Sequence, residues 1–301
     1  MRRLGALLLK KKLDGSSKGS RAWWSAAAPD ASSFAEVRDP VIESLPAADR
    51  EVLAAIWQKR GGLELLVASG FSSLLVELFE HGSIQPVYEW LSQAVRDEVH
   101  HAQISVEMAA KYRGGEPIWP TAEKNLVPPF APATGAMHAT LYVIAMCCIN
   151  ETVACGVLQA SMAGAESPLA KAALQTILTD EIDHARAGWA HLASPFVTPR
   201  MKEVLPQWLE RLHEAKLREL YEDDEPLPGE AYPKHGMLSR ERSRAVVRET
   251  LFEVMFPGFA AVGIDPSLAR EWAEDATARA KGRIRNGEQG SENGERGEAR
   301  P

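Results

Sequence analysis

Most of this 301-residue chain shows apolar residues that recur every three or four positions, in segments separated by short clusters rich in Gly, Pro and Ser. This period is typical of helices with one buried face, whereas strands alternate apolar and polar residues. No alternating run of useful length is found. The sequence therefore predicts an all-α protein with helices near Ala48–Arg60, Leu63–Glu80, Gln85–Arg113, Gly135–Ala163, Pro168–Ala193, Arg200–Glu222, Ser239–Met255 and Pro266–Lys281.

One expected helix is apolar on almost all sides. The run Leu141–Leu158 carries a single charged residue, Glu151. A helix that is apolar all round is typical of the interior of a larger bundle. A buried carboxylate is costly unless it has a partner. A metal cation would account for Glu151, and a protonated or hydrogen-bonded core Glu is the alternative.

Two segments repeat the motif Asp-Glu-x-x-His, Asp97–His101 and Asp180–His184. On a helix, residues three positions apart share a face, so the Glu and the His of each copy can point at one place. A Glu-x-x-His from each of two helices, with a lone Glu from each of two more, is the ligand set of a dimetal carboxylate site. A third Glu-x-x-His, Glu210–His213, lacks the preceding Asp and lies in the charge-rich segment Trp208–Glu222. We interpret this third copy as a solvated helix face.

Each motif of a dimetal site needs a partner Glu on the preceding antiparallel helix. For the second motif, the buried Glu151 is the candidate. The midpoint between Glu151 and Glu181 is Glu166, inside the segment Ala163–Pro168. That segment combines helix-breaking and N-cap signals. A hairpin that folds back there would bring the two carboxylates level.

For the first motif, the preferred partner is Glu64. The midpoint between Glu64 and Glu98 is His81, next to Gly82, where a turn is expected. Two other carboxylates, Glu77 and Glu80, lie too close to this turn to be level with Glu98. The weak point of this choice is Gly61–Gly62, because glycine disfavours a helix and could break it just before the ligand.

With these residues the chain resembles the ferritin-like diiron-carboxylate superfamily, whose pattern is E…DExxH…E…DExxH. The resemblance covers roughly Asp49 to Pro195. It implies a ferritin-like four-helix bundle with a cofactor of two Fe ions or a Mn/Fe pair. In such relatives, the Asp before each ligand Glu accepts a hydrogen bond from the metal-bound His of the other motif. The resemblance thus implies the metal ligands Glu64, Glu98, His101, Glu151, Glu181 and His184, with Asp180 as the partner of His101 and Asp97 as that of His184.

Several departures separate the chain from particular members of the superfamily. Ser105 stands where ribonucleotide reductase small subunits have a radical-forming Tyr, so a tyrosyl-radical reductase is disfavoured. Ile177 replaces the third His of the p-aminobenzoate N-oxygenase type, and Cys155 replaces a Thr of hydroxylating monooxygenases. The sequence has no Cys-x-x-Cys pair of the rubredoxin kind found in many rubrerythrins. None of these differences excludes an oxygenase.

Composition narrows the class of protein further. The net charge is −7 and no basic, aromatic-rich stretch occurs, which disfavours nucleic-acid binding. All three cysteines, Cys147, Cys148 and Cys155, lie in the apolar run around Glu151. An odd number of cysteines on one apolar helix favours reduced thiols in a cytoplasmic protein, packed as small core residues.

The chain divides into four expected regions. Residues 1–40 form a basic tail, for which we prefer a flexible segment over an organelle transit peptide, and its apolar run Leu4–Leu9 is too short to span a membrane. Residues 48–195 form the dimetal bundle, with the proline-rich loop Gly114–Thr134 as its long crossover. Residues 196–281 form additional C-terminal helices, which either cover one end of the site or form a homodimer face. Residues 282–301 are expected to be disordered.

The resulting functional hypothesis is an O₂-activating oxygenase or oxidase that acts on a small organic substrate. Because the chain has no nucleotide-binding glycine motif and no clustered cysteines, electrons are expected from a separate reductase or ferredoxin. The alternatives are an iron-handling protein, such as a ferroxidase or a rubrerythrin-like peroxide scavenger, and a helical scaffold without activity. Small residues beside the motifs, Ala94 and Gly188, leave room for a substrate or allow close helix contact, and the sequence favours neither.

Overall fold

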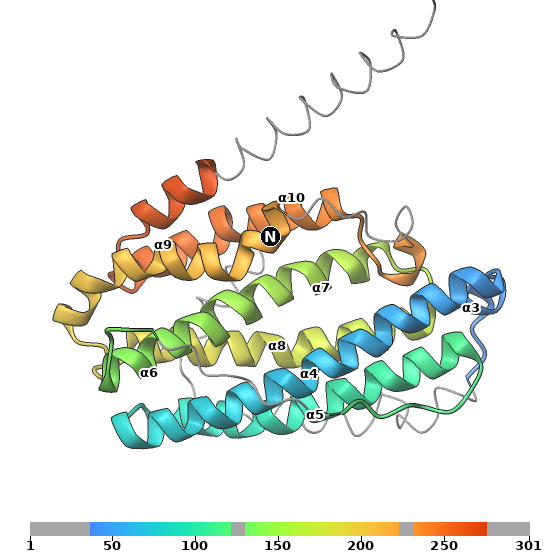
Figure 1. Ribbon diagram of the computed structural model, residues 1–301, viewed down its shortest axis with the longest axis horizontal. Coiled ribbons are helices and arrows are strands. Elements are labelled where there is room, and N and C mark those ends of the chain that lie inside the picture. Colours follow the sequence, from blue (N-terminus) through green and yellow to red (C-terminus); the bar gives the residue numbers. More distant parts are fainter. Residues whose placement is uncertain (1–36, 122–129, 223–231, 276–301) are drawn as a thin grey trace, which may run out of the picture.

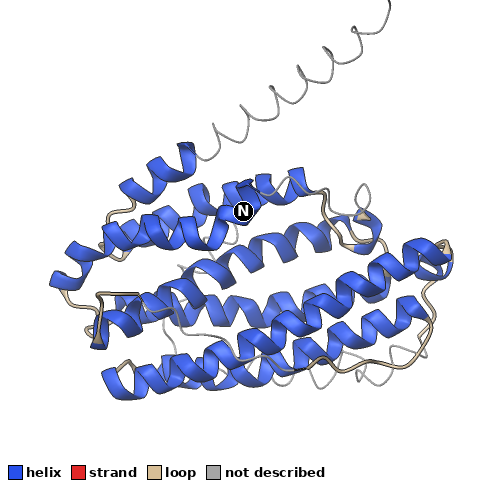
Figure 2. Cartoon of the chain, in the orientation of Figure 1, coloured by secondary structure: helices blue, strands red, loops and turns tan. Residues whose placement is uncertain are grey.

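The computed structural model describes residues 37–121, 130–222 and 232–275, and these residues form helices and loops without a strand (Figure 2). The predicted all-α class is confirmed, whereas most of the expected tails and part of the proline-rich loop lie outside the described residues. The long helices are α4 (Ala47–His81), α5 (Gln85–Arg113), α8 (Pro168–Ala193) and α9 (Pro199–Glu222). The shorter elements are α3 (Pro40–Glu43), α6 (Gly135–Val143), η2 (Ile144–Glu151), α7 (Thr152–Gly164), η3 (Pro233–His235), α10 (Arg240–Thr250), η4 (Leu251–Met255) and α11 (Phe256–Ala261), with a further helical stretch at 267–275.

The long helical segments lie side by side (Figure 1). Helix α4 packs along α5, and α8 packs against both α5 and the continuous α6–η2–α7 segment. The C-terminal elements lie on the α6–η2–α7 segment, because α10 contacts α7 and α9 contacts η2. The C-terminal helices therefore cover η2 and α7.

Helix α4 runs without interruption through Gly61–Gly62, so the prediction of two helices, Ala48–Arg60 and Leu63–Glu80, is wrong. The reason is a close approach between α4 and α5. A Cβ atom on Gly61 would lie 3.0 Å from Val106 Cγ1 and 3.3 Å from the carbonyl oxygen of Ala102. Glycine serves at this position for helix contact, which outweighs its low helix propensity.

Both turns expected between the motif-bearing helices and their partners are present. Gly82 ends α4 with a φ of 94°, a conformation that favours glycine, and its missing side chain leaves room for the ring of Phe196. The second turn ends at Ser167, whose hydroxyl oxygen accepts a hydrogen bond from the N–H of Ala170 at 3.1 Å. Pro168 is the first residue of α8. Proline has no backbone N–H, but at this position an N–H would have no acceptor within the helix, so no hydrogen bond is lost.

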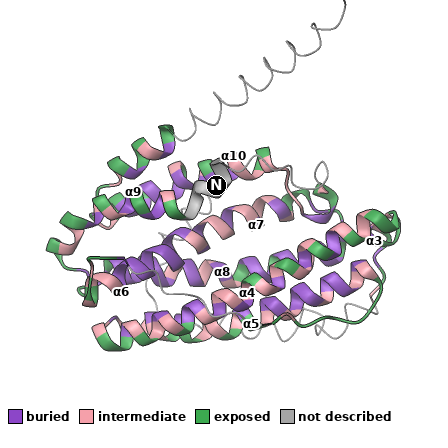
Figure 3. Cartoon of the chain, in the orientation of Figure 1, coloured by how far each residue is buried: buried purple, intermediate pink, exposed green. Residues whose placement is uncertain are grey.

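The apolar run is buried as predicted, but it is not a regular α-helix. Every residue from 139 to 149 is buried, which Figure 3 shows as a continuous stretch along this segment. Within it, Ile144–Glu151 forms a π-helix between α6 and α7. Such wide turns are uncommon and often occur at functional sites. This one ends at the candidate ligand Glu151.

Two described helical segments are long and apolar enough to cross a membrane, Ala47–His81 and Gly135–Gly164. The core helix of a soluble protein can have the same length and composition. In the most apolar window of Gly135–Gly164, 78% of the residues are buried inside the molecule, as expected for a core helix. In the corresponding window of α4 only 33% are buried, so this helix presents much apolar surface to its surroundings.

Candidate metal centre

Four helical segments contribute the acidic and histidine side chains of one buried cluster. Among the described residues, two groups place their possible ligand atoms within 4.8 Å of one another. The groups share Glu98 of α5 and Glu181 of α8. The first group adds Glu64 and His101, and the second adds Glu151 and His184. The structure thus brings together all six residues for which the sequence predicted ligation.

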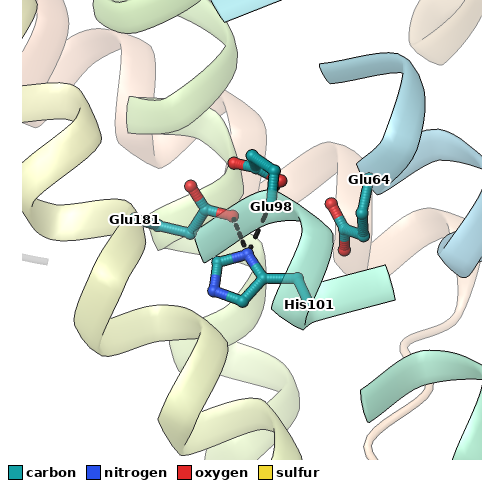
Figure 4. A group of neighbouring side chains, drawn as sticks. All are labelled: Glu64, Glu98, His101 and Glu181. Carbon is teal, nitrogen blue, oxygen red and sulfur yellow. Dashed lines mark ion pairs between the residues drawn. The ribbon is translucent and has the colours of Figure 1, made fainter. Parts of the chain in front are cut away.

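Figure 4 shows the first group, in which Glu64, Glu98, His101 and Glu181 point toward one another from three helices. The Nδ1 atom of His101 lies 3.5 Å from Glu98 Oε2 and 3.7 Å from Glu181 Oε1. In the second group, His184 Nδ1 lies 3.1 Å from Glu98 Oε1 and 2.9 Å from Glu181 Oε2. Both imidazoles therefore turn the same nitrogen toward the same two carboxylates.

The other nitrogen of each imidazole faces the Asp of the opposite motif. His101 Nε2 lies 3.2 Å from Asp180 Oδ2, and His184 Nε2 lies 3.5 Å from Asp97 Oδ2. The resemblance implied a hydrogen bond in each of these pairs. His101 Nε2 is within hydrogen-bond distance of Asp180, whereas His184 Nε2 has no hydrogen-bond partner and makes only an ion-pair contact with Asp97. An Nε2–H that donates to a carboxylate leaves Nδ1 as a lone-pair donor toward the cluster, and it fixes the ring orientation.

Apart from Glu64, which is partly exposed, the residues of the cluster are buried, and several of their polar atoms have no hydrogen-bond partner. Glu98 is 0% exposed, Glu181 3% and Glu151 4%. Both carboxylate oxygens of Glu98, one of Glu151 and the Nδ1 atom of His101 are buried without a hydrogen-bond partner. Buried polar groups are nearly always paired, and an unpaired carboxylate is especially costly. These atoms fit a cation, so the buried group can hold metal ions.

The carboxylates of the cluster lie close to one another and to the two histidines, and their pKa values shift in different directions. Burial, with the neighbouring Glu98, raises the pKa of Glu64 to about 8. Burial also raises the pKa of Glu151 well above its usual range, and the charges of Glu181 and Glu98 add to the effect. Burial alone would raise the pKa of Glu181 too, but the nearby His184 outweighs it and the pKa falls to about 2.

The histidines respond to the same negative charge. Burial by itself would lower the pKa of His101, but Asp180 and Glu98 raise it well above its usual range. The pKa of His184 is raised in the same way, chiefly by Glu181 and Asp97, against the effect of burial. The cluster thus attracts positive charge, which bound cations can supply in place of protons.

Two thiols lie beside the cluster, and the sequence reasoning treated them only as core residues. Cys147 and Cys155 stand four positions before and after Glu151 on the same helical segment. Burial raises the pKa of Cys155 well above its usual range, and the charges of Glu181 and Glu151 raise it further. The four-residue spacing from Glu151 was the signal that could have placed them near the site.

Other residues singled out from the sequence lie elsewhere. Glu77 pairs with His138 at 3.2 Å, and Glu80 is exposed, so neither joins the cluster. Ala94 lies in the packed core. Gly188 allows close helix contact, because a Cβ atom there would lie 2.6 Å from Cys147 Cβ. Of the two roles considered for Gly188, the contact with η2 is the one seen.

The interpretation of Glu210–His213 as a solvated face is wrong for its histidine. His213 is 0% exposed, and its ring packs against Phe256 and Phe259. Its Nδ1 atom donates to the carbonyl oxygen of Leu209 at 2.6 Å. The C-terminal helices cover this side of α9, which a charge count along the sequence could not reveal. Burial lowers the pKa of His213 to about 4.

Comparison with known proteins adds no identification. No protein family, no curated protein and no solved structure matches this chain at a significant level.

Proposed function

We propose that residues 48–195 form a ferritin-like four-helix bundle that holds two Fe ions or a Mn/Fe pair. The observation that carries this proposal is the sharing of Glu98 and Glu181 between the two ligand groups. Each shared carboxylate has two oxygens and would be available as a ligand in both groups. Glu64 and His101 would complete the ligands of one ion, and Glu151 and His184 those of the other. Four carboxylates and two imidazoles suit iron and manganese.

We further propose that the protein is an O₂-activating oxygenase or oxidase of a small organic substrate. Ions of this kind supply the electrons for O₂ activation when they are bound. The chain's own residues hold the ions and exclude bulk water, since the shared carboxylates are buried. Asp180 and Asp97, which face Nε2 of His101 and His184, would hold the imidazole protons on Nε2, away from the ions. Repeated turnover then requires electrons from a separate reductase or ferredoxin.

The test begins with anaerobic loading of the purified chain with Fe(II), followed by metal analysis. The loaded protein is then reduced and mixed with O₂ and a panel of small organic substrates. The oxygenase proposal expects about one product molecule per two electrons delivered, without further uptake of iron. The matched control is Glu181→Ala, which should give neither bound metal nor product.

Iron handling is the competing function, and the same experiment separates the two. A ferroxidase or storage protein would oxidise excess Fe(II) into a mineral with many metal ions per chain. Mineral formation without any oxidised substrate would contradict the oxygenase proposal, while binding of no metal at all would contradict the metal centre itself.

A further inference from the structure

Between Arg60 and Glu80, the outer face of α4 is an uncharged surface that no described element covers. Leu63 is 50% exposed, Val76 60% and Phe79 70%. Between Arg60 and Glu80 the helix carries two charged residues, and both are engaged on other sides. Glu64 joins the candidate metal centre and Glu77 pairs with His138. The face that remains consists of apolar and serine side chains, which is unusual for a solvated helix.

The outward residues follow the spacing of a helix–helix seam. Leu66, Ser69, Ser73 and Val76 are separated by three, four and three positions, and each is at least partly exposed. Alternating steps of three and four keep residues on one side of a helix and form the contact line of paired helices. Leu63 and Phe79 flank the two ends of this line.

The seam is symmetric about one position of the helix. Leu66 and Val76 are equally far from position 71, as are Ser69 and Ser73, and as are Leu63 and Phe79. An antiparallel copy of the same helix, related by a two-fold axis at this level, would set Leu66 against Val76 of the copy. It would set Ser69 against Ser73 in the same way. A two-fold interface requires this kind of self-complementary surface.

The serines at the centre can be buried at little cost. Within the seam, the hydroxyl of Ser73 donates to the carbonyl oxygen of Ser69 at 3.1 Å. Beside the seam, the hydroxyl of Ser72 donates to the carbonyl oxygen of Ala68 at 2.9 Å. Hydroxyls that are bonded within their own helix do not need water. Their small size also lets a second helix approach closely at the middle of the seam, while the larger apolar residues pack at its ends.

A nearby loop extends the apolar surface. Ile118 and Trp119 are 57% and 52% exposed. This loop is held against α4, because Gln58 Nε2 donates to the carbonyl oxygen of Ile118 at 2.8 Å. In an antiparallel pair of α4 helices, this loop of one copy lies beside the Phe79 end of the other copy. At that end, the ring of Phe79 stacks on that of Tyr88, with 4.9 Å between the ring centroids. The contact thus continues beyond the helix seam.

We propose that two copies of this chain form a dimer through the outer faces of their α4 helices, packed antiparallel about position 71. A membrane fits the face less well. The adjacent helix α5 exposes Glu89 and Arg96, and a flat lipid surface wide enough to cover α4 and α5 would have to bury these charges. A second copy need contact only the α4 seam and the loop beside it. The dimer goes beyond the proposed function and does not depend on bound metal.

The test is light scattering on the full chain during size-exclusion chromatography over a dilution series. The wild-type chain should elute as a dimer. Leu66→Lys and Val76→Glu should each weaken the dimer at least about 100-fold, because each places two unpaired charges in the seam. Val204→Glu, a matched change at an exposed valine of α9, should leave the dimer unchanged.

Mixing the two variant chains tests the register. In an antiparallel pair centred on position 71, the introduced lysine of one chain faces the introduced glutamate of the other, so an equimolar mixture should recover the dimer. Recovery also shows that both variants are folded. A monomeric wild-type chain would overturn the proposal, as would a dimer that neither variant weakens, or a mixture that stays monomeric. Binding of the monomer to phosphatidylcholine vesicles would assign the face to a membrane instead.

Discussion

The two halves of the candidate site carry the same ligand types but sit in different surroundings. Glu64 belongs to a regular α-helix at the surface and is partly exposed, whereas Glu151 ends a π-helix and is 4% exposed. Within one chain, no described element covers the outer face of α4, while α7 is covered by α10. The same ligand types are therefore held by one half with a partly exposed carboxylate and by one half packed inside the molecule. If two ions bind, they should differ in how readily they exchange.

The largest expected effect comes from removing a carboxylate that both halves share. Glu181→Ala takes a ligand from both groups and also removes a close partner of His184. The variant should lose both ions, since the remaining ligands leave each ion with an incomplete set. Metal content per chain after anaerobic loading and desalting checks this.

The control for Glu181→Ala is His213→Ala, which removes the histidine of the third Glu-x-x-His. This variant should keep its full metal content. Because His213 is buried against two aromatic rings, it should lower the free energy of unfolding by about 3 kcal/mol. Equal loss of metal in both variants would show that the cluster is not the binding site.

A second prediction separates the halves. Glu64 and Glu151 each belong to one ligand group, so Glu64→Ala and Glu151→Ala should each retain about one ion per chain. In the wild-type chain, a chelator should remove one ion faster, from the Glu64 side. The ion that Glu151→Ala retains should then be removed quickly by the chelator, and the ion that Glu64→Ala retains should be removed slowly. Identical rates would remove the distinction between the halves.

The same contrast explains what the sequence could predict. The spacing of Glu and His within each motif is local, since residues three apart share a helix face whatever the helix packs against. The hairpin midpoints at His81 and Glu166 followed from local turn signals, and both turns are present. All six candidate ligands were therefore within reach of sequence reasoning. Once the helices pair as two hairpins, the spacing of these residues is enough to bring them together.

The features that escaped prediction depend on tertiary contacts. Gly61 stays helical because α5 passes close to it, and His213 is buried because the C-terminal helices cover it. The π-helix that ends at Glu151 cannot be recognised in the sequence, because a segment that is apolar on all sides has no hydrophobic period to distinguish a π-helix from an α-helix. In each case the local sequence is compatible with two outcomes, and a partner far along the chain decides between them.

The third prediction concerns the aspartates that face the histidines. Asp180→Ala should weaken metal affinity or lower activity about 10–100-fold, because His101 would lose the group that holds its Nε2–H. Asp97→Ala should act in the same range through His184, from which it is slightly farther. Competition for the metal with a chelator of known affinity measures the effect. Unchanged affinity and activity in both variants would show that these contacts do not orient the ligands.

The smallest expected effect compares one glycine contact from each half. An added Cβ at Gly188 would lie 2.6 Å from Cys147 Cβ and 2.8 Å from Cys148 Sγ, closer than atoms can approach without moving η2. Gly188→Ala should therefore lower the free energy of unfolding by about 1–3 kcal/mol. At Gly61 the nearest atom is the Val106 methyl group at 3.0 Å, which can shift, and alanine regains about 1 kcal/mol of helix propensity. Gly61→Ala should accordingly change stability by less than about 1 kcal/mol, as measured by urea denaturation. A larger loss at Gly61 than at Gly188 would mean that the α4–α5 half, despite its exposed outer side, is the more tightly packed of the two.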